Sequence, residues 1–359
     1  MADSALAALQ DTVRAAADAR RPLAIRGGGT KTFPGEAVQG DIVDTASLAG
    51  IVAYEATELV ITARSGTPLA DVEAAMAARG QMLGFEPPHF APGGTLGGAI
   101  ATGLSGPRRP YAGAARDFVL GVRVVDGTGE ELGFGGRVMK NVAGFDVSRL
   151  MTGALGTLGV ITEVSLKCLP LPKAEGTRVI ECSADEAIRL ANRWGGRPLP
   201  ISATCWHDGR LWVRLSGAAP AVAAATQSIG GEDFGDGAAF WRSVRDHTHS
   251  FFVAMRSANT ALWRLSVKAS AAASVPGGSA QLIEWSGSLR WLATAANVDP
   301  APIRQWAAAQ GGHATQFRGQ ARAGVFTPCD ATTLQLHQRL KAQFDPHRIF
   351  NRGRLFAEL

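Results

Sequence analysis

Three consecutive glycines near the N-terminus place the strongest constraint on how this chain can fold. The segment AIRGGGTKTF, residues 24–33, sets them between an arginine and a Thr-Lys pair, directly after a short apolar run. Residues without a Cβ can reach positive φ angles and let a ligand approach the main chain within hydrogen-bonding distance. Backbone N–H groups beside two cations, Arg26 and Lys31, are typical of a phosphate site. Taken alone, the segment predicts either an anion-binding loop or a tight turn after a strand.

Length and charge favour a two-domain protein with a small ligand. The chain has 359 residues, of which 46% are hydrophobic and 19% charged, so it is long enough for two domains. Its net charge of +5 is spread along the sequence, which disfavours a nucleic-acid surface. The N-terminus lacks the features of a signal peptide, and no run approaches the roughly 20 apolar residues that span a bilayer. We therefore expect a cytoplasmic protein without a membrane span.

The four cysteines do not form a metal-binding pattern. Cys168, Cys182, Cys205 and Cys329 are far apart, with no C-x-x-C pair and no cysteine–histidine cluster. We expect no metal in this chain and interpret the cysteines as buried, reduced thiols.

Sequence patterns divide the chain near the proline-containing segment 168–176. Before it, residues 58–66 and 159–167 alternate as strands. Pro68 would be the first residue of a helix that we expect to end at Gly80. This region reads as mixed α+β. The predicted domains are residues 1–172, 173–325 and a C-terminal segment, 326–359, that returns to the first domain.

The second region predicts an antiparallel sheet covered by helices. Ser183–Glu186 forms a capping box, Asp208-Gly209 separates two alternating runs as in a hairpin, and a helix follows. The order strand, helix, hairpin, helix is that of a ferredoxin-like unit, and it partly recurs from residue 262 onward. All eight tryptophans lie here, between Trp194 and Trp306, and their concentration suggests a core or an interface.

Two further glycine-rich segments point to a long ligand. Residues 91–106 and 153–164 share the tetrapeptide Gly-Thr-Leu-Gly. Neither is a Walker loop, and no Gly-x-Gly-x-x-Gly opens a β-α-β unit, which disfavours ATP hydrolysis and Rossmann-type NAD binding. Three separate glycine loops suit one extended diphosphate ligand, and FAD fits that description.

Five motifs in order, over about 200 residues, resemble the FAD-binding domain of the vanillyl-alcohol oxidase and p-cresol methylhydroxylase (PCMH) flavoprotein family. They are RGGGTK, PGGTLGG, YAGAARDFVLGVRVVDGTGE, KNVAGFDVSRLMTGALGTLGVITEVSLK and FDPHRIFNRGRLF. Within that family, GGRVMKNVAGF, LWRLSV and IEWSGSLRWL resemble the FAD-binding subunits of bacterial glycolate oxidase complexes. The resemblance implies an α+β fold, with a two-subdomain PCMH-type domain and a cap domain on an antiparallel, ferredoxin-like sheet.

The resemblance also implies binding roles at matching positions. The first two loops would hold the pyrophosphate, Gly159–Ile161 the adenosine half, and Asn351 would reach the flavin. The matching cofactor-binding positions are Arg26, Gly27, Gly28, Gly29, Thr30, Lys31, Pro92, Gly93, Gly94, Thr95, Leu96, Gly97, Gly98, Ala101, Thr102, Gly103, Ser105, Gly106, Gly113, Ala114, Ala115, Arg116, Asp117, Gly159, Val160, Ile161 and Asn351.

Two departures from the family pattern limit the transfer. Relatives with covalent FAD place a histidine after the first glycines, where this chain has Thr30 and Lys31, so we expect non-covalent FAD. Many relatives have Gly-Tyr-Asp where Gly144-Phe145-Asp146 stands, so any role of that hydroxyl is absent.

Catalytic residues are not identified by motif. Oxidation of a 2-hydroxy acid needs a base near the hydroxyl and a cation for the carboxylate. The histidine-rich cap segment of related dehydrogenases is missing. The candidates that remain are His247 and His249, which would share one face of a strand, and His89, Arg264 and Arg290. Each has an ordinary structural alternative, such as an arginine stacked on a tryptophan.

Three function classes stay open. The resemblance favours a flavin-carrying subunit of a complex with a larger FAD subunit and an iron-sulfur subunit, acting on glycolate or D-lactate. Contact with the inner membrane would then be peripheral and made through the complex. The alternatives are a stand-alone 2-hydroxy acid dehydrogenase and a non-redox scaffold.

Overall fold

The computed structural model describes residues 2–136, 147–256, 259–320 and 324–359, and it forms two compact units. Unit 1 comprises Met1–Leu104, Ala114–Leu171 and Pro328–Leu359, and unit 2 comprises Ser105–Gly113 and Pro172–Thr327. The domain limits derived from the sequence remain a prediction. Ser105–Gly113, which that prediction assigned to the first domain, groups with unit 2.

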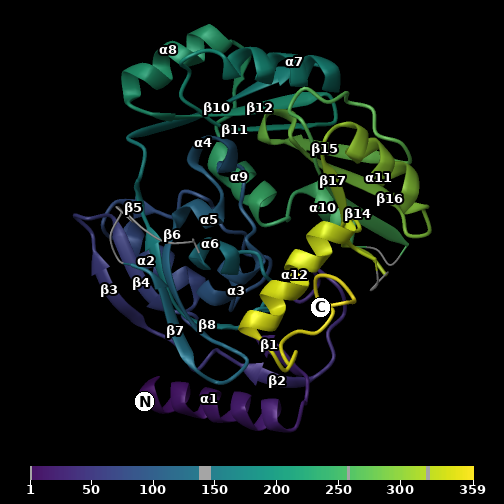
Figure 1. Ribbon diagram of the computed structural model, residues 1–359. Coiled ribbons are helices and arrows are strands. Elements are labelled where there is room, and N and C mark those ends of the chain that lie inside the picture. The colour runs from purple at the N-terminus through teal and green to yellow at the C-terminus, as the bar shows by residue number, and fades with distance from the viewer. Residues whose placement is uncertain (1, 137–146, 257–258, 321–323) are drawn as a thin grey trace. The chain divides into compact units, whose positions relative to one another are not determined.

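Unit 1 is built on a five-stranded antiparallel sheet (Figure 1). Its order is β3 (Ile51–Glu55), β4 (Val60–Arg64), β8 (Val160–Lys167), β6 (Val119–Val125) and β7 (Glu131–Gly135). The central strand β8 is buried along most of its length, although its sequence VITEVSLK includes polar residues, because it lies between β4 and β6 in the middle of the sheet. Three short helices accompany the sheet, namely α3 (Leu96–Thr102), α5 (Ala115–Phe118) and α6 (Val147–Met151).

Helix α2 (Leu69–Ala77) follows strand β4 and carries its apolar residues on one side. Leu69, Val72 and Met76 are buried, at the i, i+3, i+7 spacing of an amphipathic helix. Pro68 is the N-cap residue and not, as predicted, the first helical residue. The chain then pairs β5 (Gln81–Met82) with β9 (Leu169–Pro170).

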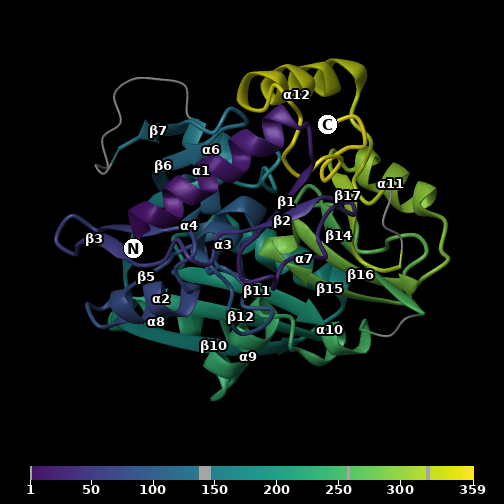
Figure 2. The ribbon, with the colours of Figure 1, turned by 90° about the horizontal axis from the view of Figure 1, so that it is seen from below.

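A second layer of unit 1 joins the first and last parts of the chain. Strand β1 (Leu23–Arg26) runs parallel to β2 (Asp41–Asp44), and Phe350 pairs with Leu23 on the other side of β1. Helix α1 (Ala2–Asp18) packs Leu9 and Val13 against this layer. Helix α12 (Ala331–Phe344) leads into the segment beside β1, as Figure 2 shows.

Unit 2 contains one eight-stranded antiparallel sheet, which confirms the predicted α+β architecture. The strands and helices of its first half are β10 (Ala174–Glu181), α7 (Ala184–Gly195), β11 (Ile201–His207), β12 (Arg210–Gly217), α8 (Ala219–Ile229) and β13 (Glu232–Asp233). Those of its second half are β14 (Thr260–Ser266), β15 (Ala280–Glu284), β16 (Leu289–Ala295), α11 (Pro300–Ala309) and β17 (His313–Arg318).

The two halves of unit 2 repeat one strand order. The sheet reads β13-β10-β12-β11 and then β15-β16-β14-β17, so each half has the ferredoxin-like order and the second strands of both halves meet at the centre. The second half has no counterpart of α7 among its described residues. Asp208 and Gly209 both have positive φ, as a two-residue hairpin turn requires. The predicted hairpin is therefore confirmed.

The aromatic residues of unit 2 form its interior. Trp194, Trp212, Trp241, Trp263, Trp285 and Trp291 are each at most 8% exposed. These six belong to a core and not to an exposed interface patch. Helices α9 (Gly237–Arg245) and α10 (Ser250–Ala254) connect the two halves.

The cysteines are free thiols in two kinds of environment. Cys168 and Cys205 are buried, as predicted, whereas Cys182 and Cys329 are partly exposed. Burial raises the pKa of the Cys168 thiol to about 11. Within the described ranges, no three His, Cys, Asp or Glu side chains gather as metal ligands. In the same part of the chain, no helix has the length and apolar character needed to cross a membrane.

Candidate cofactor site

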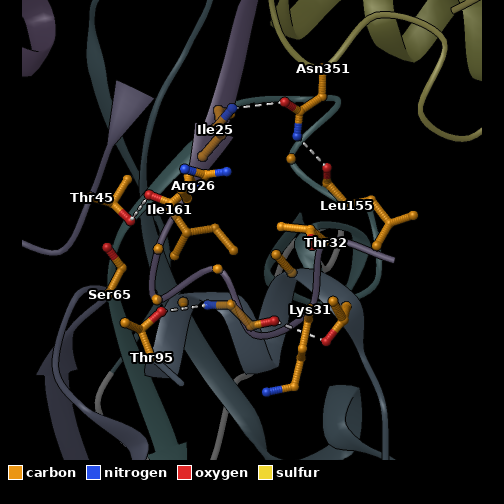
Figure 3. A pocket seen from close by; sticks show the side chains of 18 of the residues that line it. Ile25, Arg26, Lys31, Thr32, Thr45, Ser65, Thr95, Leu155, Ile161 and Asn351 are labelled. Atoms are coloured by element: carbon orange, nitrogen blue, oxygen red, sulfur yellow. Dashed lines mark hydrogen bonds between the residues drawn. The ribbon is translucent and has the colours of Figure 1, made fainter. Parts of the chain in front are cut away.

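A cavity opens in unit 1 where its glycine loops come together (Figure 3). It encloses about 780 Å³, including space open to solvent. Its walls come from the end of β1 and the following loop, the start of α3, the start of β8 and the C-terminal segment. The lining residues are Ile25, Arg26, Gly27, Gly28, Gly29, Thr30, Lys31, Thr32, Thr45, Ser65, Thr95, Gly97, Gly98, Ala101, Thr102, Leu155, Gly156, Gly159, Ile161, Asn351 and Arg354.

Part of the predicted binding set lines this cavity. The first loop does so completely, from Arg26 to Lys31. Eight further predicted residues line it: Thr95, Gly97, Gly98, Ala101, Thr102, Gly159, Ile161 and Asn351. The others do not: Pro92, Gly93, Gly94, Leu96, Gly103, Ser105, Gly106, Gly113, Ala114, Ala115, Arg116, Asp117 and Val160. The Gly144-Phe145-Asp146 motif lies outside the described residues.

Each glycine of the first loop has a different reason to lack a side chain. A Cβ on Gly28 would lie 1.6 Å from the carbonyl oxygen of Gly93, and one on Gly27 would lie 2.4 Å from Thr95 Oγ1. Only Gly29 has a positive φ, at 68°. The loop therefore allows two chain segments to touch, besides leaving its backbone open to the cavity.

Helix α3 begins at the cavity and is fixed there by its own cap. Thr95 Oγ1 accepts a hydrogen bond from Gly98 N at 3.2 Å, so this hydroxyl already has a protein partner. Gly97 packs directly on Ser65, because a Cβ on Gly97 would lie 2.6 Å from the Ser65 Cβ. The second glycine segment thus brings its backbone to the cavity wall.

The Ser65 hydroxyl is a buried polar group that the described residues leave unsatisfied. Ser65 is 1% exposed and lines the cavity, and no atom of the described chain forms a hydrogen bond with its Oγ. A buried hydroxyl without a partner costs free energy, which a ligand with polar atoms would recover. This group and the glycine walls fit a cofactor such as FAD.

Positive charge surrounds the cavity. Arg26, Lys31 and Arg354 line it, and no Asp or Glu is among its described lining residues. Lys31 is only 9% exposed and its ammonium lies 5.9 Å from the Phe90 ring centre, so it is a buried cation at the cavity wall. Arg354 Nη2 donates to the Thr32 carbonyl at 2.9 Å. An excess of cations suits a diphosphate.

Asn351 bridges two cavity walls with its side-chain amide. Its Oδ1 accepts from Ile25 N at 2.8 Å, and its Nδ2 donates to the Leu155 carbonyl at 2.7 Å (Figure 3). The sequence suggested that Asn351 reaches the flavin. In the structure both ends of the amide are bound to protein backbone.

The two cap histidines do not share a strand face, so that prediction is wrong. His247 follows α9 with a φ of 55°, and His249 is the N-cap of α10. His247 is buried and stacks on Phe252 at 3.8 Å between ring centres. Burial, followed by the field of three arginines, lowers its pKa well below the ordinary value. Burial also lowers the pKa of His249 to about 4.

Two of the other catalytic candidates, His89 and Arg290, have partners within the protein. His89 Nε2 lies 2.9 Å from a Glu73 carboxylate oxygen. Arg290 is fully buried and donates to the carbonyls of Gly287 and Ala271 at 2.7 and 2.9 Å. None of the five candidates is among the residues that line the cavity.

Arg264 has aromatic neighbours and feels the charge of Glu284, but it has no hydrogen-bond or ion-pair partner within the described chain. Its guanidinium carbon lies 5.2 Å from the Trp285 ring centre and 6.0 Å from that of Trp291. Arg109 lies over the same Trp285 ring at 4.5 Å. Burial and, secondly, the Arg109 charge lower the pKa of Arg264 to about 10.

Sequence reasoning missed seven lining residues. They are Ile25, Thr32, Thr45, Ser65, Leu155, Gly156 and Arg354. Ile25 and Thr32 are direct neighbours of predicted residues, and Arg354 closes the same Asn-Arg-Gly-Arg run as Asn351. Thr45 and Ser65 carry no comparable signal, because each reaches the cavity only through strand pairing.

Comparisons with known proteins show which family the chain resembles. An FAD binding domain family model matches residues 4–135. The glycolate oxidase subunit GlcE of Escherichia coli (strain K12) is 46% identical over 98% of this chain and 97% of its own length. A D-lactate dehydrogenase of Anaerostipes hadrus is 36% identical, over 38% of this chain and 28% of its own length.

Solved structures show the same fold at low identity. An alkyldihydroxyacetonephosphate synthase superposes with a TM-score of 0.67 and 16% identity, over 96% of this chain and 74% of its own. This likeness confirms the PCMH-type fold. FAD is the cofactor, and the chain belongs to the family of the glycolate oxidase subunit GlcE, as an FAD-dependent oxidoreductase subunit.

Proposed function

We propose that this chain is the FAD-carrying subunit of a complex that oxidises glycolate to glyoxylate. The conversion of the alcohol to the aldehyde releases two electrons and two protons, and we propose that the electrons pass to an iron-sulfur partner. The near full-length identity with GlcE, a glycolate oxidase subunit, is the observation that carries this proposal. A second, larger flavoprotein would be the other partner, and any membrane contact would be made by the partners.

The cavity residues would hold FAD without a covalent bond. Backbone N–H groups of the first glycine loop, with Arg26, Lys31 and Arg354, would neutralise the pyrophosphate, and Ser65 Oγ would gain its missing partner. Bound FAD would supply the two-electron acceptor that the amino acid side chains lack. No histidine stands in the first loop, where related proteins attach the cofactor.

Arg264 is the candidate that we carry forward for binding the substrate carboxylate. It differs from His89 and Arg290 because no carboxylate or carbonyl of the described chain accepts a hydrogen bond from it. A weakly hydrated guanidinium beside aromatic rings is suited to a planar carboxylate. Arg264→Met should raise KM for glycolate more than it lowers kcat, measured in the complete complex. An unchanged KM would remove Arg264 from the site.

Isolation from the native cell tests the assignment as a subunit. We expect the chain to co-purify with one larger flavoprotein and one iron-sulfur protein. Glycolate should bleach the flavin absorbance of this complex, and acid precipitation should release the chromophore into the supernatant. A chain that purifies alone and is bleached by glycolate would instead be a stand-alone dehydrogenase. Colour that stays in the acid pellet would contradict non-covalent binding.

A further inference from the structure

The segment after α12 is tied to unit 1 by a buried ion pair. Lys341 and Asp345 are 1% and 0% exposed, and Lys341 Nζ lies 2.7 Å from Asp345 Oδ2. The same ammonium donates to the carbonyls of Thr157 and Phe350, both at 2.7 Å. All three N–H groups of Lys341 therefore have oxygen partners, on the glycine loop before β8, on the C-terminal segment and on α12's own cap residue.

Asp345 fixes the turn that follows α12. Its two carboxylate oxygens accept hydrogen bonds from Ile349 N at 3.0 Å and Phe350 N at 2.8 Å. The chain then runs beside β1, where Leu23 N donates to the Ile349 carbonyl at 2.7 Å and Asn351 N donates to the Leu23 carbonyl at 2.9 Å. Residues 349–351 thus extend the β1–β2 pair by one short strand.

This arrangement places the Asn351 amide between two loops that line the cavity. One end holds Ile25, the residue before Arg26 and the first glycine loop, and the other holds Leu155, the residue before Gly156. A Cβ on Gly156 would lie 2.7 Å from Asn351 Nδ2, so the loop can approach the amide only as glycine. Asn351 itself has a φ of 37°, a conformation that asparagine tolerates better than most residues.

We infer that Lys341, Asp345 and Asn351 form a clasp that sets the separation of the first and third glycine loops, and that Asn351 is a positioning residue for FAD. This inference depends on the proposed FAD site. FAD affinity then depends on the Asn351 hydrogen bonds to Ile25 and Leu155, although FAD itself takes no part in them. The reason is that the two loops must be held at the distance that matches the diphosphate and its flanking groups.

Asn351→Asp is the sharpest test. Aspartate keeps the acceptor for Ile25 N but presents oxygen, and no donor, to the Leu155 carbonyl. We expect the dissociation constant of FAD to rise about tenfold or more, the ratio for one lost hydrogen bond. The matched control is Gln10→Ala, which removes an amide bond to the Gly129 carbonyl elsewhere in unit 1. It should change the FAD dissociation constant less than twofold or so.

The comparison separates positioning from general destabilisation. Both variants should lower the unfolding temperature of the FAD-free protein, but only Asn351→Asp should weaken FAD at temperatures well below unfolding. Equal FAD affinities for the two variants would overturn the clasp. If the wild-type protein itself binds no FAD, the proposed site fails first, and the two failures are thereby distinguished.

Hydrogen exchange on the wild-type full-length protein gives a test that needs no variant. If the clasp and the cofactor are coupled, FAD should slow exchange of the Ile25 and Phe350 amides, which bond to clasp side chains. The Gly98 amide, bonded to Thr95 at the cavity, provides the positive control. Slowing at Gly98 with no change at Ile25 and Phe350 would contradict the inference.

Discussion

The two units use their residues in opposite ways. Around the cavity of unit 1, close contacts are made by the main chain, as where Gly28 meets the Gly93 carbonyl and Gly97 meets Ser65. In the core of unit 2, many contacts are made between large aromatic rings. Trp212 stacks on Phe240 at 4.6 Å between centres, and Trp291 meets Phe317 edge-on at 4.9 Å.

This difference predicts different tolerance to change. No residue is smaller than glycine, and the backbone atoms that it contacts cannot move aside by changing rotamer. Adding even one methyl group there therefore forces a chain segment to shift. A ring in a core can be exchanged for another large apolar side chain at modest cost. Cofactor binding by unit 1 therefore depends on the identity of its glycines, whereas the fold of unit 2 depends on the total volume of its core side chains.

The largest effect on FAD binding should come from Gly28→Ala. The new Cβ would collide with the Gly93 carbonyl at 1.6 Å, so the first two glycine loops must separate. We expect FAD affinity to fall by about two orders of magnitude or more, equivalent to roughly 3 kcal/mol. Titration of FAD fluorescence measures this.

Two matched glycines serve as controls for that collision. Gly29 and Gly209 have positive φ angles of 68° and 76°, yet no backbone atom lies close to where their Cβ would be. Alanine at either position should cost only the conformational strain, about 1 kcal/mol. If Gly28→Ala binds FAD as well as Gly29→Ala does, the contact between loops is unimportant.

Lys341→Met should destabilise unit 1 by about 3–5 kcal/mol, because it leaves the buried Asp345 carboxylate without its cation. The comparison is Arg189→Met in unit 2, where the Arg189–Glu186 pair is exposed to solvent. Losing such a solvent-screened pair should change stability only slightly. Urea unfolding followed by circular dichroism gives both values. If both variants lost similar amounts of unfolding free energy, the buried pair would be no more important for stability than the exposed pair.

Acid should weaken unit 2 through its histidines. Burial keeps His247 and His249 neutral in the folded state, with the pKa of His249 at about 4, while the unfolded value is about 6.5. Since the folded pKa is lowered, the neutral form is favoured on folding. The associated stability is complete above about pH 6.5 and is lost as the pH falls toward 4.

Tryptophan fluorescence measures this acid effect selectively, because all eight tryptophans lie between Trp194 and Trp306 in unit 2. His249→Asn is the matched variant, since asparagine can still cap α10 at the Phe251 amide but does not titrate. It should flatten the loss of stability between pH 6.5 and 4. An unchanged slope would exclude His249 as a contributor.

The smallest effect should come from Ser65→Ala, which should leave stability unchanged or slightly higher but weaken FAD binding. The hydroxyl has no partner in the protein, so the FAD-free stability should stay the same or rise slightly. FAD binding should weaken about three- to tenfold, the ratio for one neutral hydrogen bond. A variant with unchanged affinity would show that Ser65 does not contact the cofactor.

The sequence revealed the parts of the site that are local and missed those made by tertiary contacts. The triple glycine, the second glycine-rich segment and the order of strands in unit 2 all follow from short patterns. That Gly28 faces Gly93, that Lys31 is buried and that Ser65 reaches the cavity depend on segments far apart in sequence. The histidine prediction failed because Arg245 ends a helix, so the alternation His-x-His falls in a turn where period-two reasoning does not apply.

The bond between Ile25 and Asn351 spans 326 residues, and this separation has a consequence for biosynthesis. During translation β1 leaves the ribosome early, but the strand that covers its free edge emerges only after nearly all the rest of the chain. Closing so long a loop is entropically slow and comes late in folding. The wall of the cavity is therefore completed late, because Asn351 joins two of the loops that line it. We expect tight FAD binding only once this contact has formed.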